Sequence, residues 1–255
     1  MNQPAQTNTR QKAIFISDLH LQPALPETTR AFLDFLQTQG KQTERLYILG
    51  DLFEYWAGDD DMDSEYLKTV VGAIRTLSDS GTDIFWICGN REFLTGDRFL
   101  EATGAKALPE PAVMELAGKK IALVHGDAQC TDDPAYMQFR TMVRNPLWQK
   151  QFLSMPLAQR KALIAGMRED SQKGNQEKSA KMMDVNTSVI DELFDRTGAT
   201  VLIHGHTHHS GHHIHQSANG ERIRLVLSDW NLDISPARGD WIVLTQEGDL
   251  QRHTC

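Results

Sequence analysis

The chain has 255 residues, which is enough for one large domain or two small ones with a full hydrophobic core. Hydrophobic residues make up 40% and charged residues 24%, an ordinary globular balance, and no apolar run is long enough to span a membrane. The net charge of −8 argues against a general nucleic-acid-binding protein, because such proteins are usually basic.

Short apolar runs rich in β-branched and aromatic residues predict buried strands. In chain order these runs cover residues 13–17, 46–50, 84–88, 121–125 and 201–204. Helical stripes lie between some of them, within residues 32–36, 66–77 and 189–194, the last with a predicted cap at each end, Asn186 and Gly198. Strands that alternate with helices predict an α/β layered fold. Two later runs, 223–228 and 241–245, have no helix between them and predict an antiparallel part near the C-terminus.

A long stretch in the second half of the chain contains no predicted strand and is rich in Met, Gln, Lys and Arg. Its residues Trp148 and Phe152 lie near helical spacing. We therefore expect two parts, a main domain of residues 1–133 and 186–255 and a helical insertion of residues 134–185. The apolar positions of the insertion either line a cleft or pack onto the core, and the sequence leaves both open.

The cysteines and the N-terminus indicate the compartment. Cys88, Cys130 and Cys255 are scattered, with no spacing typical of a zinc site or a disulfide framework. The N-terminal residues are polar and lack the apolar stretch of a signal peptide. We therefore expect reduced thiols and a cytoplasmic protein.

Side chains that commonly bind metals follow the ends of five predicted strands. They are Asp18 and His20, then Asp51, then Asn90, then His125, and finally His206 and His208. Catalytic groups often gather at the carboxyl ends of strands in α/β sheets, so we expect one site. Within each of the two pairs, both side chains would face the same way if the strand continued, because its period is two. Turn propensity explains a single Asp or Asn after a strand, but it does not explain four histidines.

The order of these motifs, DxH, GDxx, GNxx, a lone His and GHxH, resembles the calcineurin-like metallophosphoesterase superfamily over almost the whole chain. The resemblance implies a layered β-sandwich flanked by helices, here with the insertion as a helical lid. It also implies two divalent metal ions bridged by Asp51. One ion would also be held by Asp18, His20 and His208, and the other by Asn90, His125 and His206. Imidazole and carboxylate ligands suit Mn²⁺, Fe²⁺ or Zn²⁺, and the family precedent favours Mn²⁺.

Two such ions would clamp a phosphoryl group and activate a bridging water, with Asp51, Asn90, Arg91 and His125 as catalytic residues. Arg91 departs from the family pattern, because most members have His there, often assigned as general acid for an alcohol leaving group. A guanidinium keeps its proton at working pH, but it grips phosphate oxygens in bidentate fashion. A departing phosphate monoester, with a second pKa of about 6, needs no acid. Arg91 therefore predicts cleavage of a diphosphate bond.

Four segments resemble signatures of the UDP-2,3-diacylglucosamine hydrolases of lipid A synthesis: residues 50–60, 89–93, 125–140 and 171–186. This narrower resemblance implies attack on the uridine-side phosphorus of UDP-2,3-diacylglucosamine, giving UMP and 2,3-diacylglucosamine 1-phosphate. It implies substrate contacts at Asn90, Arg91, Asp133, Ser171, Asn175, Lys178 and His206. Glu92 stands where the family more often has Asp, and we expect little effect because the charge is kept.

A diacylated substrate must be drawn from a bilayer, so we expect peripheral association with the cytoplasmic face of the inner membrane. The candidate contact on the insertion lies near Trp148, Phe152 and Leu153. No nucleic-acid partner is expected, and the sequence does not indicate an oligomeric state.

Two alternatives use the same fold. The first is another dimetal enzyme, a nucleotide diphosphatase, cyclic-nucleotide phosphodiesterase or nuclease, and Arg91 and the insertion count against the last two. The second is a catalytically inactive scaffold, which would have lost ligands that this chain retains. Two polar clusters have simpler interpretations. We expect a solvated loop, not a third metal site, at His209, His212, His213 and His215, and a solvated or capping stretch at Asp59, Asp60, Asp61 and Asp63.

Overall fold

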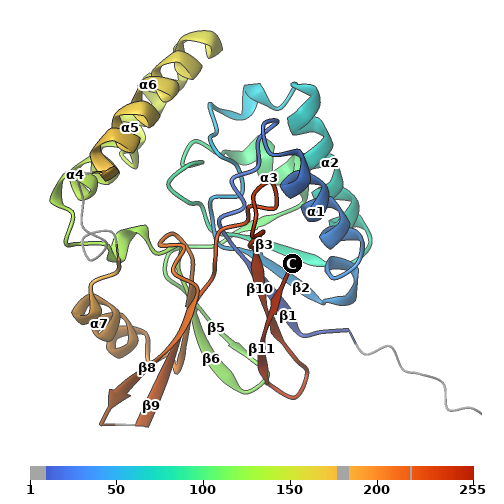
Figure 1. The fold of residues 1–255 in the computed structure, drawn as a ribbon, viewed down its shortest axis with the longest axis vertical. Coiled ribbons are helices and arrows are strands. Elements are labelled where there is room, and N and C mark those ends of the chain that lie inside the picture. The colour runs from blue at the N-terminus through green and yellow to red at the C-terminus, as the bar shows by residue number, and fades with distance from the viewer. Residues whose placement is uncertain (1–9, 177–183, 219) are drawn as a thin grey trace, which may run out of the picture.

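The computed structural model describes residues 10–176, 184–218 and 220–255, with the side chains of all but 169–176. Two β-sheets pack face to face, and helices cover their outer faces (Figure 1). The first sheet has the strand order β11-β10-β1-β2-β3-β4. Its strands are β1 (Ala13–Ile16), β2 (Arg45–Ile48), β3 (Asp83–Trp86), β4 (Lys106–Ala107), β10 (Asp240–Leu244) and β11 (Leu250–Thr254). The strands β1 to β4 run parallel, whereas β10 is antiparallel to β1 and β11.

The second sheet has the order β5-β6-β7-β9-β8. Its strands are β5 (Ala112–Leu116), β6 (Lys119–Leu123), β7 (Val201–His204), β8 (Gly211–Ser217) and β9 (Gly220–Val226). The three central strands β6, β7 and β9 are parallel, and β5 and β8 are antiparallel edges. Each sheet therefore contributes parallel strands whose carboxyl ends can carry a site.

Helices cover each sheet on its outer face. The first sheet carries α1 (Pro26–Gln37), α2 (Glu65–Asp79) and α3 (Asp97–Thr103), and the second carries α7 (Thr187–Thr197) (Figure 1). Short 3₁₀ turns lie at Gly40–Gln42, Asp59–Asp61 and Asp127–Gln129. The caps of α7 match the sequence prediction. Asn186 accepts a hydrogen bond from the backbone of Ser188 at its start, and Gly198 is left-handed at its end.

The strands β1, β2 and β7 are buried on both faces, and the alternation of their side chains separates two cores. In β1, Phe15 points into the sandwich, and Ile14 and Ile16 lie under the helices. The Phe15 ring stacks on Tyr47, which stacks on Phe85, with centroid separations of 5.0 and 4.8 Å. An aromatic ladder thus crosses the three parallel strands that end at the candidate site.

All seven predicted strands are present, with bounds shifted by up to a few residues. The two late runs form β9 and β10, which lie in different sheets. β10 is antiparallel to both of its neighbours, as expected, whereas β9 is antiparallel to β8 and parallel to β7. The solvated-loop prediction is wrong for His212, His213 and His215, which lie in strand β8. This strand is polar because it is an edge, and the more apolar β9 supplies the ladder of backbone hydrogen bonds.

The insertion contains α4 (Pro134–Val143), α5 (Pro146–Leu153) and α6 (Leu157–Gln176), which project from the sandwich (Figure 1). Its base is tied to the acidic run. Arg160 of α6 is 2% exposed and donates to Asp60 and to the carbonyls of Ala57 and Met155. Lys161 lies 2.6 Å from Asp61. The run therefore docks the insertion, besides its expected capping role.

That capping role falls to Asp59. Its carboxylate accepts hydrogen bonds from the backbone N–H groups of Gly96 and Phe99 at the start of α3, at 3.0 and 3.1 Å. The indole of Trp56 donates to the same carboxylate at 3.0 Å. This part of the prediction is confirmed.

The predicted membrane contact is wrong for two of its three residues. Phe152 is 4% exposed, and Trp148 stacks on it with a centroid separation of 4.8 Å while packing against Phe93. Both rings fill the joint between the insertion and the helices, because this interior offers more apolar contact than the outer face. Leu153 is 41% exposed. Within the described ranges, no helix combines the length and apolar character needed to cross a membrane.

Candidate metal centre

The side chains predicted to bind metal all lie just beyond strand ends. Those after β1, β2 and β3 come from the first sheet, and those after β6 and β7 come from the second. The ends of both sheets meet at one edge of the sandwich, and the residues gather into two groups of possible metal ligands. The first group is Asp18, His20 and His208, and the second is Asp51, His125 and His206.

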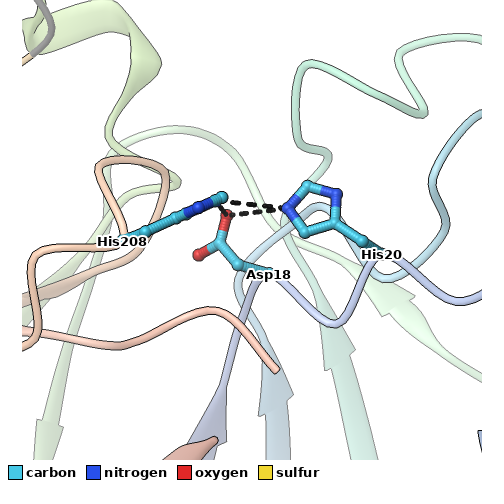
Figure 2. A group of neighbouring side chains, drawn as sticks. All are labelled: Asp18, His20 and His208. Atoms are coloured by element: carbon cyan, nitrogen blue, oxygen red, sulfur yellow. Dashed lines mark hydrogen bonds and ion pairs between the residues drawn. The ribbon is translucent and has the colours of Figure 1, made fainter. Parts of the chain in front are cut away.

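Figure 2 shows the first group, in which the two imidazoles converge on one carboxylate oxygen. Asp18 Oδ1 lies 3.4 Å from His208 Nε2 and 3.9 Å from His20 Nε2. The two Nε2 atoms lie 3.2 Å apart. Asp18 is fully buried, and its Oδ1 has no hydrogen-bond partner among the described residues. A buried oxygen of this kind needs a cation or a proton beside it.

In the second group, Asn90 joins two histidines. Its Oδ1 lies 2.9 Å from His125 Nε2 and 2.9 Å from His206 Nδ1. Asp51 Oδ1 lies 3.6 Å from the same Nε2 of His125. Four groups of imidazole, carboxylate and amide type therefore face one point.

The outer nitrogen of His125 fixes its tautomer. His125 Nδ1 lies 2.8 Å from the carbonyl oxygen of Leu49, so this nitrogen carries the proton. His20 Nδ1 lies 3.0 Å from Glu54 Oε2 as an ion-pair contact. The Nε2 atom of each ring faces the other ligand atoms of its group. Electron-rich atoms crowded in this way repel one another unless a cation lies between them, so both groups fit divalent ions.

Burial and neighbouring charges shift the pKa values of the ligand side chains. Burial would lower the pKa of His125, but the carboxylates of Asp51 and Asp18 outweigh it and raise that pKa to about 9. Burial, reinforced by the charge of His125, lowers the pKa of His206 to about 4. Burial would raise the pKa of Asp18, but the close approach and charge of His208, whose Nε2 lies 3.4 Å from Oδ1, hold that pKa well below its usual range. The carboxylates thus attract positive charge strongly, which a metal ion would supply.

The backbone differs from the expected continuing strands. Positive φ angles occur at Asp18, His20, Asp51, His206 and His208, at 56°, 48°, 53°, 66° and 58°. Neither pair therefore continues its strand, and the prediction from strand period is wrong for both. Asp18 and His20 still meet, through left-handed backbone, whereas His206 and His208 enter different groups. Left-handed backbone at non-glycine residues costs of order 1–2 kcal/mol each and clusters at functional sites.

Two glycines of the motifs are required by this packing. A Cβ at Gly89 would overlap the Asp51 carboxylate, and a Cβ at Gly205 would overlap the Asp18 carboxylate. The glycines before Asn90 and His206 therefore let two loops approach two buried carboxylates.

Arg91 stands at the rim of the centre. Its backbone N–H donates to Asp51 Oδ1 at 2.9 Å, and its guanidinium lies 3.9 Å from Asp51 Oδ2. Glu54 lies 3.7 Å from the same guanidinium and also pairs with Arg168 of α6. About a third of the Arg91 side chain is exposed, so it can reach a bound anion. Glu54 therefore connects His20, Arg91 and the insertion.

Glu92 has a larger role than the sequence indicated. It is fully buried, and its carboxylate accepts the backbone N–H groups of Asp51, Phe53 and Gly89, the latter two at 3.0 and 3.2 Å. Burial and the charge of Asp51 raise the pKa of Glu92 above its usual range. This side chain holds the loops of Asp51 and Asn90 together. Its position in the motif gave a charge but no indication of burial.

The expected substrate contacts divide into two sets. Asn90, Arg91 and His206 lie at the centre. At the start of the insertion, Asp133 is 6% exposed and caps α4 by accepting the N–H of Tyr136 at 3.0 Å. Ser171 and Asn175 lie within α6 where side chains are not described, and Lys178 lies outside the described residues.

Comparison with known proteins gives the family. Residues 12–210 match the family model described as calcineurin-like phosphoesterase. A protein of Aromatoleum aromaticum named UDP-2,3-diacylglucosamine hydrolase is 45% identical over 228 residues, which are 89% of this chain and 93% of that protein. Proteins of the same name from Serratia proteamaculans and Bordetella parapertussis are 44% and 42% identical, covering 86% and 91% of this chain and 91% of each relative. The chain therefore belongs to the calcineurin-like phosphoesterase family, and the resemblance seen in its motifs is confirmed.

Proposed function

We propose that this member of the calcineurin-like phosphoesterase family hydrolyses the diphosphate bond of UDP-2,3-diacylglucosamine, giving UMP and 2,3-diacylglucosamine 1-phosphate. The observation that carries the proposal is the identity of 42–45% to relatives of that name over nearly their whole length. The two ligand groups and the guanidinium of Arg91 supply chemistry suited to a diphosphate.

Two divalent ions, Mn²⁺ in this proposal, belong to the site. Asp18, His20 and His208 would hold one, and Asn90, His125 and His206 would hold the other. Asp51 would bridge them. In support, it lies in the second group, and its carbonyl oxygen accepts the backbone N–H of His20 of the first group at 3.0 Å. Bound ions of this kind generate a nucleophile from water at neutral pH and hold phosphoryl oxygens.

Arg91 binds phosphate oxygens and transfers no proton. Its guanidinium stays charged at working pH and offers a fork of donors. The guanidinium lies at the rim, 3.9 Å from Asp51 and 3.7 Å from Glu54, with about a third of the side chain exposed to an approaching anion. The leaving sugar phosphate is a weak base, so its charge needs matching more than protonation.

The insertion, residues 134–185, is proposed to act as a lid over the main domain of residues 1–133 and 186–255. Asp133, Ser171, Asn175 and Lys178 anchor the acylated glucosamine and its phosphate. This pose leaves the uridine-side phosphorus over the ligand groups. The pairing of Arg168 in α6 with Glu54 supports a lid that reaches the centre.

Peripheral attachment to the cytoplasmic face of the inner membrane completes the proposal. The substrate carries two acyl chains and must leave a bilayer. The insertion exposes several large apolar side chains, Met142 at 44%, Leu147 at 78%, Leu153 at 41% and Leu163 at 41%. These residues replace Trp148 and Phe152 as the candidate contact.

Product analysis tests the function. The Mn²⁺-loaded protein is incubated with UDP-2,3-diacylglucosamine in ¹⁸O-water, and the products are identified by mass spectrometry. We expect UMP carrying the label and unlabelled 2,3-diacylglucosamine 1-phosphate. Label in the lipid phosphate would overturn the pose, and absence of turnover would overturn the substrate. Other UDP-sugars, cyclic nucleotides and DNA, assayed in parallel, would reveal a different dimetal activity.

A further inference from the structure

One face of α4 converges on a single buried carboxylate. Tyr136, Arg140 and Arg144 are spaced by four residues, which places them on one side of the helix and its C-cap. Asp127 is fully buried, and its Oδ2 accepts from the Tyr136 hydroxyl at 2.9 Å and from Arg140 Nε at 2.8 Å. A guanidinium nitrogen of Arg144 lies 3.6 Å from the same oxygen. Asp127 follows His125 by two residues, so this cluster lies directly behind the second ligand group.

Arg140 and Arg144 also contact the loops that carry the second ligand group, Arg140 through Glu110. Arg144 donates to the carbonyls of Cys88 and Gly89, both at 3.1 Å, and these residues directly precede Asn90. Arg140 donates to Glu110 Oε2 at 3.3 Å. The other oxygen of Glu110 accepts the backbone N–H of His125 at 2.7 Å.

Tyr136 of the same face contacts the ring of His206. The centroid of Tyr136 lies 5.8 Å from that of His206, with the planes tilted by 33°. This face of α4 therefore contacts the second ligand group at three places: the loop before Asn90, the loop of His125 and the ring of His206. Among the hydrogen bonds, ion pairs and ring contacts of the described residues, none joins this face to Asp18, His20 or His208.

We infer that α4 positions the second ligand group, with Arg144 and Asp127 fixing the Asn90 turn relative to His125. The inference deepens the proposed dimetal function and rests on it. Arg144 is suited to the task because its side chain brings Nη2 within 3.1 Å of both carbonyls and 3.6 Å of the Asp127 carboxylate, and the lysine side chain is one bond shorter. Groups that orient metal ligands from behind typically change metal affinity about 10–100-fold when removed.

The sign of the effect separates positioning from simple electrostatics. Arg144 is a cation behind a cation site, so its charge alone disfavours a divalent ion. If charge were its only influence, Arg144→Ala would tighten binding at the second group. Positioning predicts weaker binding in spite of the lost positive charge.

Calorimetric titration of metal-free protein with Mn²⁺ tests the inference. We expect two ions on the wild-type chain. Arg144→Ala should keep one at wild-type affinity and bind the other about 10–100-fold more weakly, with Arg144→Lys changed in the same direction. Lys161→Ala is the matched control, because it removes another insertion contact, to Asp61, away from the centre.

Two further variants identify the affected ion. In a His208→Ala chain the second group remains, and adding Arg144→Ala should weaken the remaining ion. In a His206→Ala chain the first group remains, and the same addition should leave its affinity unchanged. Unchanged or tighter binding in Arg144→Ala, or equal weakening of both ions, would overturn the inference. If Arg144→Ala fails to fold, Arg144→Lys decides by the same criteria. Fewer than two ions on the wild-type chain would instead refute the metal site itself.

Discussion

Replacing Glu92 by glutamine should destabilise the protein although the shape of the side chain is kept. One oxygen of Glu92 accepts the N–H groups of Asp51 and Gly89, and the other accepts the N–H of Phe53. Glutamine has only one acceptor oxygen, so at least one buried N–H must face an amide that also donates. An unsatisfied buried donor costs about 1–3 kcal/mol. At about 2–4 °C per kcal/mol for a chain of this size, the melting temperature should fall by roughly 2–12 °C.

The free energy of unfolding would be measured by urea denaturation of metal-free protein, followed by tryptophan fluorescence. Glu101→Gln is the control, because it makes the same chemical change on an exposed side chain. Mn²⁺ affinity should fall as well, since Glu92 joins the loops of Asp51 and Asn90. A Glu92→Gln chain as stable as wild type would mean that the buried carboxyl is already neutral, with one oxygen donating. That result would refute the acceptor role assigned to it.

Three further predictions address the rim and the insertion. Arg160→Ala should lower the free energy of unfolding by about 3 kcal/mol, because two carbonyls lose a buried charged donor. Lys161→Ala should lower it by less than about 1 kcal/mol, and similar urea midpoints for the two variants would contradict the role of Arg160. Arg91→Ala should reduce kcat about 100–1000-fold with the metals retained, and Arg91→His should not exceed wild type on the diacylated substrate. Leu147→Glu should weaken sedimentation with phospholipid vesicles while leaving turnover of a detergent-dispersed substrate intact, and unchanged sedimentation would rule out this contact.

The sequence predicted the parts of the fold in which one signal dominates. Runs such as Ala13–Ile16 and 201–203 are apolar throughout because their strands are buried on both faces, so composition alone identifies them. Asn186 and Gly198 bound α7 because cap geometry depends on local residue type. These features are decided within a few residues of chain.

Edge strands could not be predicted in the same way. Strand β8 contains three histidines, and β11 reads Leu-Gln-Arg-His-Thr. Both are mostly exposed, so neither carries the apolar alternation that marks a half-buried strand. Their backbones are ordered by neighbours distant from any local signal, β9 and β10. Polar composition therefore favoured a loop where the ladder gives a strand.

The insertion shows the limit of helical periodicity. Spacing placed Trp148 and Phe152 on a helix, but it could not say whether the partner of that face was lipid or protein. The burial of Arg160 could not be predicted either, since a charged residue is expected at the surface and this one is 2% exposed. Two of its partners, Ala57 and Asp60, lie in or just before the acidic run about 100 residues earlier, and only tertiary structure brings them to Arg160.

At the metal centre, the sequence predicted the ligand residues correctly but their backbone conformation incorrectly. The strand period would place His206 and His208 on one side, yet a turn in which Thr207 N–H donates to the Gly205 carbonyl at 2.8 Å sends them to separate groups. What the motifs record is a steric requirement. Gly89 and Gly205 leave room for the buried carboxylates of Asp51 and Asp18, so each glycine is tied to an aspartate far away in sequence. The motifs therefore indicate the site even where the backbone departs from a strand, because each buried carboxylate requires a glycine at the point where the second loop packs against it.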